Sequence, residues 1–235
     1  MYIFMVEAFA ITASFRVPEA HTFQQTLPLP PVTTLTGLVG AAIGLNFEDA
    51  INFKKDKGLG LGVIGSYRDM FKDLWKYRKV KAGEVISDVI LREYLIDFRM
   101  KLFVGCYDKD ILSGVREHFL SPAYVLTAGN SDDLLKIKKV SNIFATEELP
   151  IHKFQNTILP GDYSSFYEPS IDLSDTPITE SIRAPEVYLL PTAFRFSGKE
   201  RRVIERRPFT FVGSPVELKQ PLQGFEVEGD NFVLL

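Results

Sequence analysis

The chain has 235 residues, of which 46% are apolar and 24% are charged. These fractions are typical of a folded globular protein and exclude intrinsic disorder. There are 27 Lys and Arg residues against 30 Asp and Glu residues, a net charge of −3, which excludes a protein that coats nucleic acid nonspecifically. No uncharged apolar stretch reaches the roughly 18 residues of a membrane span, so we expect no membrane partner.

The cysteine and histidine content bears on redox chemistry and on metals. The single cysteine, Cys106, excludes an internal disulfide and a Cys-rich zinc site, and it predicts a reducing, cytoplasmic location. None of the three histidines has the spacing of a metal-binding motif, so we expect neither a metal nor another cofactor. Residues Met1–Ile11 carry Glu7 and no cationic start, so they do not predict a signal peptide.

The first quarter of the chain predicts a strand, a loop and a helix. Residues 2–11 are rich in β-branched and aromatic side chains and predict the first strand. Four prolines between residues 12 and 31 exclude a helix there. Thr33 or Thr34 then offers a hydroxyl N-cap for an amphipathic helix over 35–43.

The next segments continue the alternation of strands and helices. Residues 59–66 predict a second strand, and 88–104 a third, because apolar and mixed positions alternate there. Asp108 or Asp110 can cap a second helix that ends at a proline, and 123–127 predict a short fourth strand.

The order of these elements indicates an α+β fold. It predicts a ferredoxin-like (RRM-like) βαββαβ domain over residues 1–135. Short strand-like runs and ten of the fourteen prolines follow residue 120, so residues 136–235 predict a smaller β-rich C-terminal part. Many unrelated functions use the ferredoxin-like fold, and the fold alone therefore does not decide between them.

One short segment, residues 67–81, concentrates positive charge and aromatic side chains. It carries six cations against two carboxylates, a net charge of +4. Cations that track phosphates and aromatics that stack on bases suit a single-stranded nucleic acid. The alternative is a solvated helix whose aromatic side chains pack inward. The candidate RNA contacts of this segment are Tyr67, Arg68, Trp75, Lys76, Tyr77, Arg78, Lys79 and Lys81.

A second segment, residues 195–207, again holds six cations against two carboxylates. Residues 196–199 predict a hairpin turn between exposed strands. Here the candidate phosphate contacts are Arg195, Arg201 and Arg202. The alternative is a charged edge that protects a sheet from aggregation.

Catalytic side chains are sparse. His118 lies near the end of the second predicted helix, with Arg116 and Tyr124 close in sequence. Such a cluster can cleave RNA without a metal by general acid–base chemistry. The alternative is a helix-end histidine with a structural role.

The region around the first predicted helix carries a family resemblance. The run Pro31-Val32-Thr33-Thr34-Leu35-Thr36-Gly37-Leu38-Val39-Gly40-Ala41-Ala42-Ile43-Gly44 follows Phe15-Arg16 and Leu27-Pro28, and Phe119-Leu120-Ser121-Pro122-Ala123-Tyr124 comes later. In this order the motifs resemble the CRISPR-associated Cas-five family, RAMP-superfamily subunits of type I Cascade complexes. The similarity covers about residues 1–135.

This resemblance implies a non-catalytic, RNA-binding subunit of an antiviral effector complex. Such subunits hold the 5′ handle of the CRISPR RNA and contact the backbone Cas-seven subunit and the large subunit. A thumb-like insertion corresponds to about residues 67–87. Residues implied at the handle site are Arg16, Thr33 and Thr34, with Gly129 and Asn130 in a glycine-containing loop.

Two alternatives to this function remain open. In the subtype I-C branch of the family the subunit is a metal-independent endoribonuclease that processes precursor CRISPR RNA with a Tyr/Lys/His set. Here Arg116-Glu117-His118 stands where a Lys-His pair is wanted, so that set is not reproduced. The other alternative is a protein–protein scaffold whose basic segments are buried against partner subunits.

Overall fold

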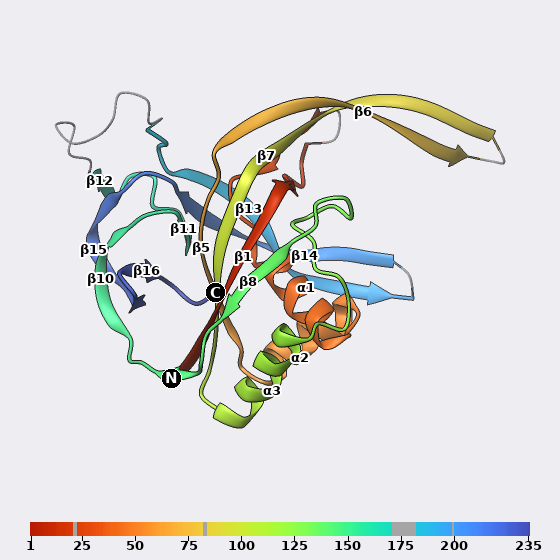
Figure 1. Cartoon of the computed structure of the whole chain (residues 1–235). Coiled ribbons are helices and arrows are strands. Elements are labelled where there is room, and N and C mark those ends of the chain that lie inside the picture. Colours follow the sequence, from red (N-terminus) through yellow and green to blue (C-terminus); the bar gives the residue numbers. More distant parts are fainter. Residues whose placement is uncertain (21–22, 82–83, 171–181, 199) are drawn as a thin grey trace.

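The structure, a computed structural model, describes residues 1–20, 23–81, 84–170, 182–198 and 200–235. The side chains of residues 77, 79, 81, 84 and 86 lie outside this description. The fold is mixed and mostly β, with three helices on one face of a large central sheet (Figure 1). Within the described residues no helix is long and apolar enough to cross a membrane.

Four antiparallel strands form the middle of the central sheet. In spatial order they are β5 (Gly60–Ser66), β7 (Glu84–Cys106), β1 (Tyr2–Ala13) and β8 (Lys136–Val140). The helices that connect them are α1 (Val32–Ile43), α2 (Phe47–Asp56) and α3 (Lys109–Leu120). The predicted strands at 2–11 and 59–66 and the cap at Asp108 are confirmed, since Asp108 accepts from the backbone N–H groups of Asp110 and Ile111.

The C-terminal strands complete the sheet and add a second one. The central sheet continues beyond β5 through β11 (Thr157–Pro160), β14 (Glu200–Val212) and β13 (Glu186–Ser197). A second sheet contains β10 (Leu149–Phe154), β15 (Val216–Val227), β12 (Tyr167–Pro169) and β16 (Asp230–Phe232). Short strands are β2 (Phe15–Arg16), β3 (Phe23–Gln24), β4 (Thr26–Leu27) and β9 (Phe144–Ala145).

The first half of strand β1 is buried on both faces, and its alternating side chains belong to two different cores. Phe4 and Val6 belong to the core beneath the helices, whereas Ile3 and Met5 belong to a core that contains Phe232 of the second sheet. Successive side chains of a strand point to opposite faces, so a run without polar residues fits this double burial. Figure 1 shows the helices on one side of β1 and the strands β10, β15 and β16 on the other.

Two predicted local structures are wrong. The N-cap of α1 is Pro31, which makes no side-chain cap, and Thr33 and Thr34 lie within the first turn. Residues 123–127 do not form the fourth strand, which is β8 instead. The N–H groups of Ala123 and Tyr124 donate to carbonyls of α1 at 2.9 and 3.2 Å. This segment therefore forms hydrogen bonds with the end of a helix instead of with a strand.

The basic segment 67–81 is a strand, not a helix. β6 (Asp69–Lys81) pairs along its length with the first part of β7, and together they form a long hairpin, here called the β6–β7 arm (residues 69–96). Successive side chains of β6 point to opposite faces of the hairpin. Phe71 and Trp75 therefore share one face, and Lys72 and Lys76 share the other. The third predicted strand is correspondingly longer than 88–104, because it continues into the arm.

A second hairpin projects on the same side of the molecule (Figure 1). The ends of β13 and β14 pair from Ala193↔Glu205 to Ser197↔Glu200. Of the turn predicted at 196–199, Phe196 and Ser197 lie in β13, and Lys199 lies outside the described residues. This hairpin is here called the β13–β14 arm (residues 193–205).

The stacked rings between the two sheets generate a stability prediction. Phe103 of β7 lies 3.8 Å from Phe232, centroid to centroid, and both rings are fully buried. We expect Phe103→Ala to lower the free energy of unfolding by about 3–5 kcal/mol in urea titrations, because it leaves a cavity. The control Phe71→Ala, on the exposed arm, should cost about 1 kcal/mol at most. Equal losses would contradict the role of this contact.

Candidate nucleic-acid interface

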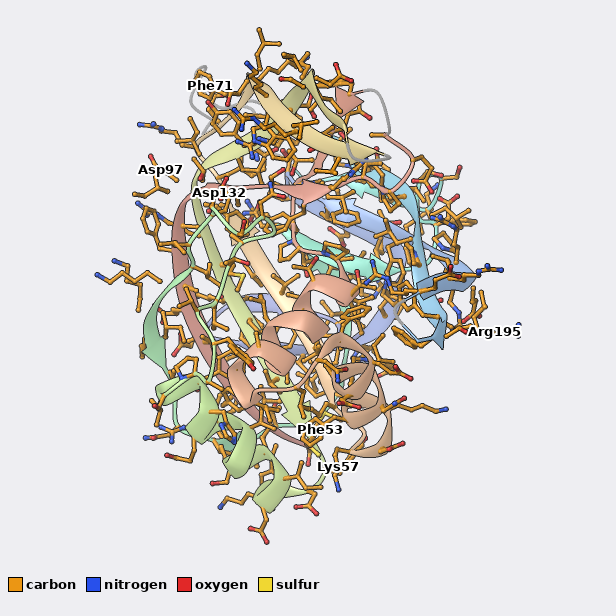
Figure 2. The ribbon with its side chains drawn as sticks, turned by 90° about the vertical axis from the view of Figure 1, so that its right-hand side faces the viewer. Phe53, Lys57, Phe71, Asp97, Asp132 and Arg195 are labelled. Atoms are coloured by element: carbon orange, nitrogen blue, oxygen red, sulfur yellow. The ribbon has the colours of Figure 1, made fainter. Side chains whose placement is uncertain are left out.

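A cavity of about 670 Å³ lies where five separate parts of the chain meet. These parts are the end of β1, the first turn of α1, the start of α2, the loop at 129–130 and the β13–β14 arm. Figure 2 views this side of the molecule, with the helices between the loop that carries Asp132 and the arm that carries Arg195. Residues from the sequence prediction that line the cavity are Arg16, Thr33, Thr34, Gly129, Asn130 and Arg201.

The first turn of α1 gives the cavity a positive end. The N–H groups of Thr34 and Leu35 donate to the carbonyl of Pro31 at 2.8 and 3.0 Å. Those of Val32 and Thr33 have no partner among the described residues, and the first turn contains no acidic side chain. Unpaired N–H groups together with the helix dipole favour an anion at this position.

Three arginines line the cavity, and no lining residue is acidic. Arg206 is neutralised by Glu19 at 2.6 Å, a contact that also ties the 17–25 loop to β14. Arg16 donates to the carbonyl of Ala20 at 3.3 Å and has no carboxylate partner within the described residues. The guanidinium of Arg201 has no carboxylate partner within the described residues. The cavity therefore holds two uncompensated cations beside the helix terminus.

Aromatic rings hold Arg201 in place. Its guanidinium carbon lies 4.8 Å from the ring centre of Phe47 and 5.2 Å from that of Phe194. The two rings meet edge to face at 5.6 Å, and both line the cavity. This cation–π cluster joins the β13–β14 arm to α2. The rings fix the position of the guanidinium and supply no carboxylate to it.

Sequence reasoning missed these two phenylalanines because it missed helix α2. The signals were present: Asn46 caps the helix by accepting from the N–H of Asp49 at 2.9 Å, and Lys54 and Lys55 occupy the last turn. These are standard start and stop signals of a helix. The contact between Phe47 and Phe194 spans nearly 150 positions and had no sequence signal.

The glycine loop is pressed against the end of β1. Gly129 has a φ of +106°, and a Cβ there would lie 1.9 Å from the carbonyl oxygen of Ser14. The N–H of Ser14 in turn donates to the carbonyl of Ala128 at 3.0 Å. Only glycine fits this close approach, which sets the position of Asn130 at the cavity wall.

The remaining residues predicted on the β13–β14 arm lie outside the cavity. Arg195 is paired directly opposite Arg202, whereas Arg201 is opposite Phe196, so Arg201 faces the cavity and the other two arginines face away. Figure 2 shows Arg195 at the outer edge of the arm. Arg202 forms an exposed ion pair with Glu200 at 3.2 Å.

The predicted residues at the base of the β6–β7 arm make local contacts. Tyr67 packs under the guanidinium of Arg183, whose carbon lies 3.8 Å from the ring centre, and it borders a different cavity. Burial raises the pKa of Tyr67, so the phenol stays protonated at neutral pH. Arg68 pairs with Asp97 at 3.1 Å.

Farther out on the arm, side chains are exposed. Trp75 is 39% exposed, and the guanidinium carbon of Arg92 lies 5.6 Å from its ring centre. Lys76 and Arg78 are exposed. The side chains of Tyr77, Lys79 and Lys81 were also predicted to contact RNA but lie outside the described part of the structure.

The three residues considered for RNA cleavage are not joined. Arg116 donates from Nε to the carbonyl of Ser141 at 2.6 Å and pairs with Glu117 at 3.0 Å. His118 is exposed at the end of α3, and Tyr124 is 62% exposed. Among the described residues no hydrogen bond, ion pair or ring contact links Arg116, His118 and Tyr124 to one another.

Comparison with known proteins supports a shared fold with CRISPR-associated proteins. No protein-family model and no curated protein matches the chain. A solved chain described as part of a CRISPR RNA-guided surveillance complex is 16% identical, with a TM-score of 0.54 over 93% of this chain and 91% of that chain. A CRISPR protein from Archaeoglobus fulgidus is 13% identical, with a TM-score of 0.53 over 100% of both chains. A third structure, of a Cas protein, has a TM-score of only 0.37 over 55% of this chain and 57% of that chain, and carries no argument.

The glycine loop generates a prediction. We expect Gly129→Ala to lower the free energy of unfolding by about 2 kcal/mol or more, because it adds a clash with Ser14 to the strain of a positive φ. The matched control is Gly198→Ala on the β13–β14 arm, where φ is +58° and a Cβ meets nothing within 4 Å. It should cost about 1 kcal/mol in the same urea titration. Equal losses for the two variants would contradict the close approach.

Proposed function

We propose that the chain is a Cas-five-type subunit of a type I CRISPR effector complex that binds CRISPR RNA and holds its 5′ handle. The observation that carries this proposal is the cavity at the start of α1. It combines unpaired helix N–H groups, two uncompensated arginines and exposed ring surface, the groups that bind the phosphates and bases of a single strand. The fold shared with CRISPR-associated proteins supports the same role.

In this proposal the N-terminal unit is a ferredoxin-like βαββαβ domain. The elements β1, α1, β5, β7, α3 and β8 follow that order, with α2 and the β6–β7 arm inserted. Because β8 pairs with β1, the proposed domain ends at residue 140 rather than 135. Residues 141–235 then form the β-rich C-terminal part, which contributes the β13–β14 arm to the cavity.

The β6–β7 arm corresponds to the thumb of this proposal. Its cationic face offers contacts to RNA, and its exposed aliphatic side chains, which include Leu74, Val80 and Val85, offer contacts to protein. We propose the backbone Cas-seven subunit and the large subunit as the partner proteins. An arm that meets protein along with RNA would explain why so much apolar surface is exposed beside the cations.

We further propose that the chain holds RNA without cutting it. The guanidinium of Arg116 is tied to the 141–142 segment and to Glu117, and it lies on a different helix face from His118, two residues on. General acid–base cleavage needs both groups within hydrogen-bond reach of one phosphate.

The binding proposal predicts a difference between two double variants of equal charge. Arg16→Gln with Arg201→Gln removes the two cavity cations, and we expect the Kd for a labelled CRISPR repeat RNA to rise about tenfold to a hundredfold. The control, Arg195→Gln with Arg202→Gln, removes two cations that face away and should change the Kd less than about threefold. Filter binding over a salt series should also give a slope smaller by about 0.7 for each lost phosphate contact. Equal effects would indicate general charge attraction and contradict the cavity.

The absence of cleavage is tested separately. Purified chain incubated with the labelled repeat RNA in EDTA should leave the RNA intact on a denaturing gel. A discrete cut at one phosphate, lost in His118→Ala, would overturn the proposal in favour of a metal-independent endoribonuclease.

A further inference from the structure

The face of the central sheet opposite the helices is covered along only part of its length. Over Ile3, Met5 and Phe103 it is buried by Phe225 and Phe232. Farther along β1 and β7 the cover ends, and a cavity of about 540 Å³ opens over the same face. It is here called the back-face cavity, and its side chains include Glu7, Phe9, Arg99, Lys101 and Lys138.

Ion pairs neutralise one half of this cavity. Lys101 forms a short ion pair with Asp230 of the second sheet. Glu7 pairs with Lys139 at 3.6 Å. The two remaining cations are Arg99, whose side chain has no hydrogen bond or ion pair among the described residues, and Lys138.

Both remaining cations flank one aromatic ring. Arg99 is paired directly opposite Phe9 across β1 and β7. The ammonium nitrogen of Lys138 lies 5.4 Å from the ring centre of Phe9. Lys138 reaches this face through a β-bulge, because β8 carries one extra residue between the partners of Glu7 and Ala8. Bulges of this kind re-aim a side chain.

The surface around Phe9 is uncovered. Phe9 itself is only half-buried, and Ile11, two positions on and on the same face, is 71% exposed. A partly accessible ring beside two cations can stack a base while the cations hold the adjacent phosphates. The cavity volume is within the range of sites for small ligands, so it can accept one nucleotide.

We propose that the back-face cavity binds one nucleotide of a single-stranded nucleic acid, at a site separate from the cavity at α1. The base stacks on Phe9, and the flanking phosphates meet Arg99 and Lys138. The ring of Phe9 beside the two cations favours this ligand over an acidic peptide, because a base can stack on the ring whereas a carboxylate cannot. The inference rests on this face alone and does not depend on the proposed function.

Two exposed lysines allow a matched test. Lys138 lines the cavity, whereas Lys219, on β15 of the second sheet, does not. The full chain is titrated with a fluorescent ten-nucleotide oligouridylate and, in parallel, oligothymidylate, which distinguish RNA from DNA as the source of the strand. We expect Lys138→Gln to weaken binding about threefold or more, and Lys219→Gln to leave it within about 1.5-fold. Phe9→Leu keeps the apolar bulk and should weaken binding about fivefold or more.

Three outcomes would overturn the inference. Equal effects of Lys138→Gln and Lys219→Gln would do so, as would the absence of cross-links to the β1 peptide with an oligonucleotide that carries 4-thiouridine. The third outcome combines two results: polyglutamate competes in a way that depends on Lys138, and Phe9→Leu has no effect on oligonucleotide binding. Together they would assign the site to an acidic protein segment. We expect the double variant with Arg16→Gln and Arg201→Gln to keep the cross-link to the β1 peptide. Loss of binding at one cavity can therefore be measured independently of the other. Unchanged urea unfolding midpoints show that the variants fold.

Discussion

The structure depends on the burial of both faces of the strand pair β1 and β7. The helices cover one face, and the second sheet covers the other over half its length. This second contact requires small residues: a Cβ on Gly62 would lie 2.5 Å from the ring of Phe232, and one on Gly105 would lie 2.6 Å from Leu234. Because β1 and β7 are packed on both faces, the loops and arms that leave the ends of these strands start from fixed positions. Rigid elements position functional side chains more accurately than loops do.

The two cavities lie where the packing on the faces of β1 and β7 ends. At one end of β1 the chain turns past Ser14 into Arg16, and the loop of Gly129 packs on that turn, so the first turn of α1 and the β13–β14 arm converge there. On the other face the cover stops short of Phe9, which leaves the back-face cavity open. In both places the uncompensated cations lie next to half-buried rings. A chain with a net charge of −3 can thus present two local cationic surfaces.

Much of the N-terminal half could be predicted from the sequence, and particular residues show where prediction stopped. The proline-rich loop, the helix after it and the cap at Asp108 follow from local chemistry, and they are observed. The fourth strand was misassigned because the backbone of Ala123 is used by the end of α1, a tertiary contact that no propensity reveals. The helix considered as the alternative for residues 67–81 is wrong, because β6 pairs with β7 along its length. Strand pleating places Phe71 and Trp75 on one face and Lys72 and Lys76 on the other.

The sequence by itself determined most strands and helices of the N-terminal half and the two basic segments. The family resemblance implied five further residues, Arg16, Thr33, Thr34, Gly129 and Asn130, which share one cavity with Arg201. Only the tertiary structure decided which arginines have a carboxylate partner: Arg206 pairs with Glu19, whereas Arg201 rests on Phe47 and Phe194. It also decided that Arg99 and Lys138 flank Phe9. The reason is physical. Propensity and capping act over a few neighbouring residues, whereas charge pairing and ring stacking depend on distances between segments that only the packed core brings together.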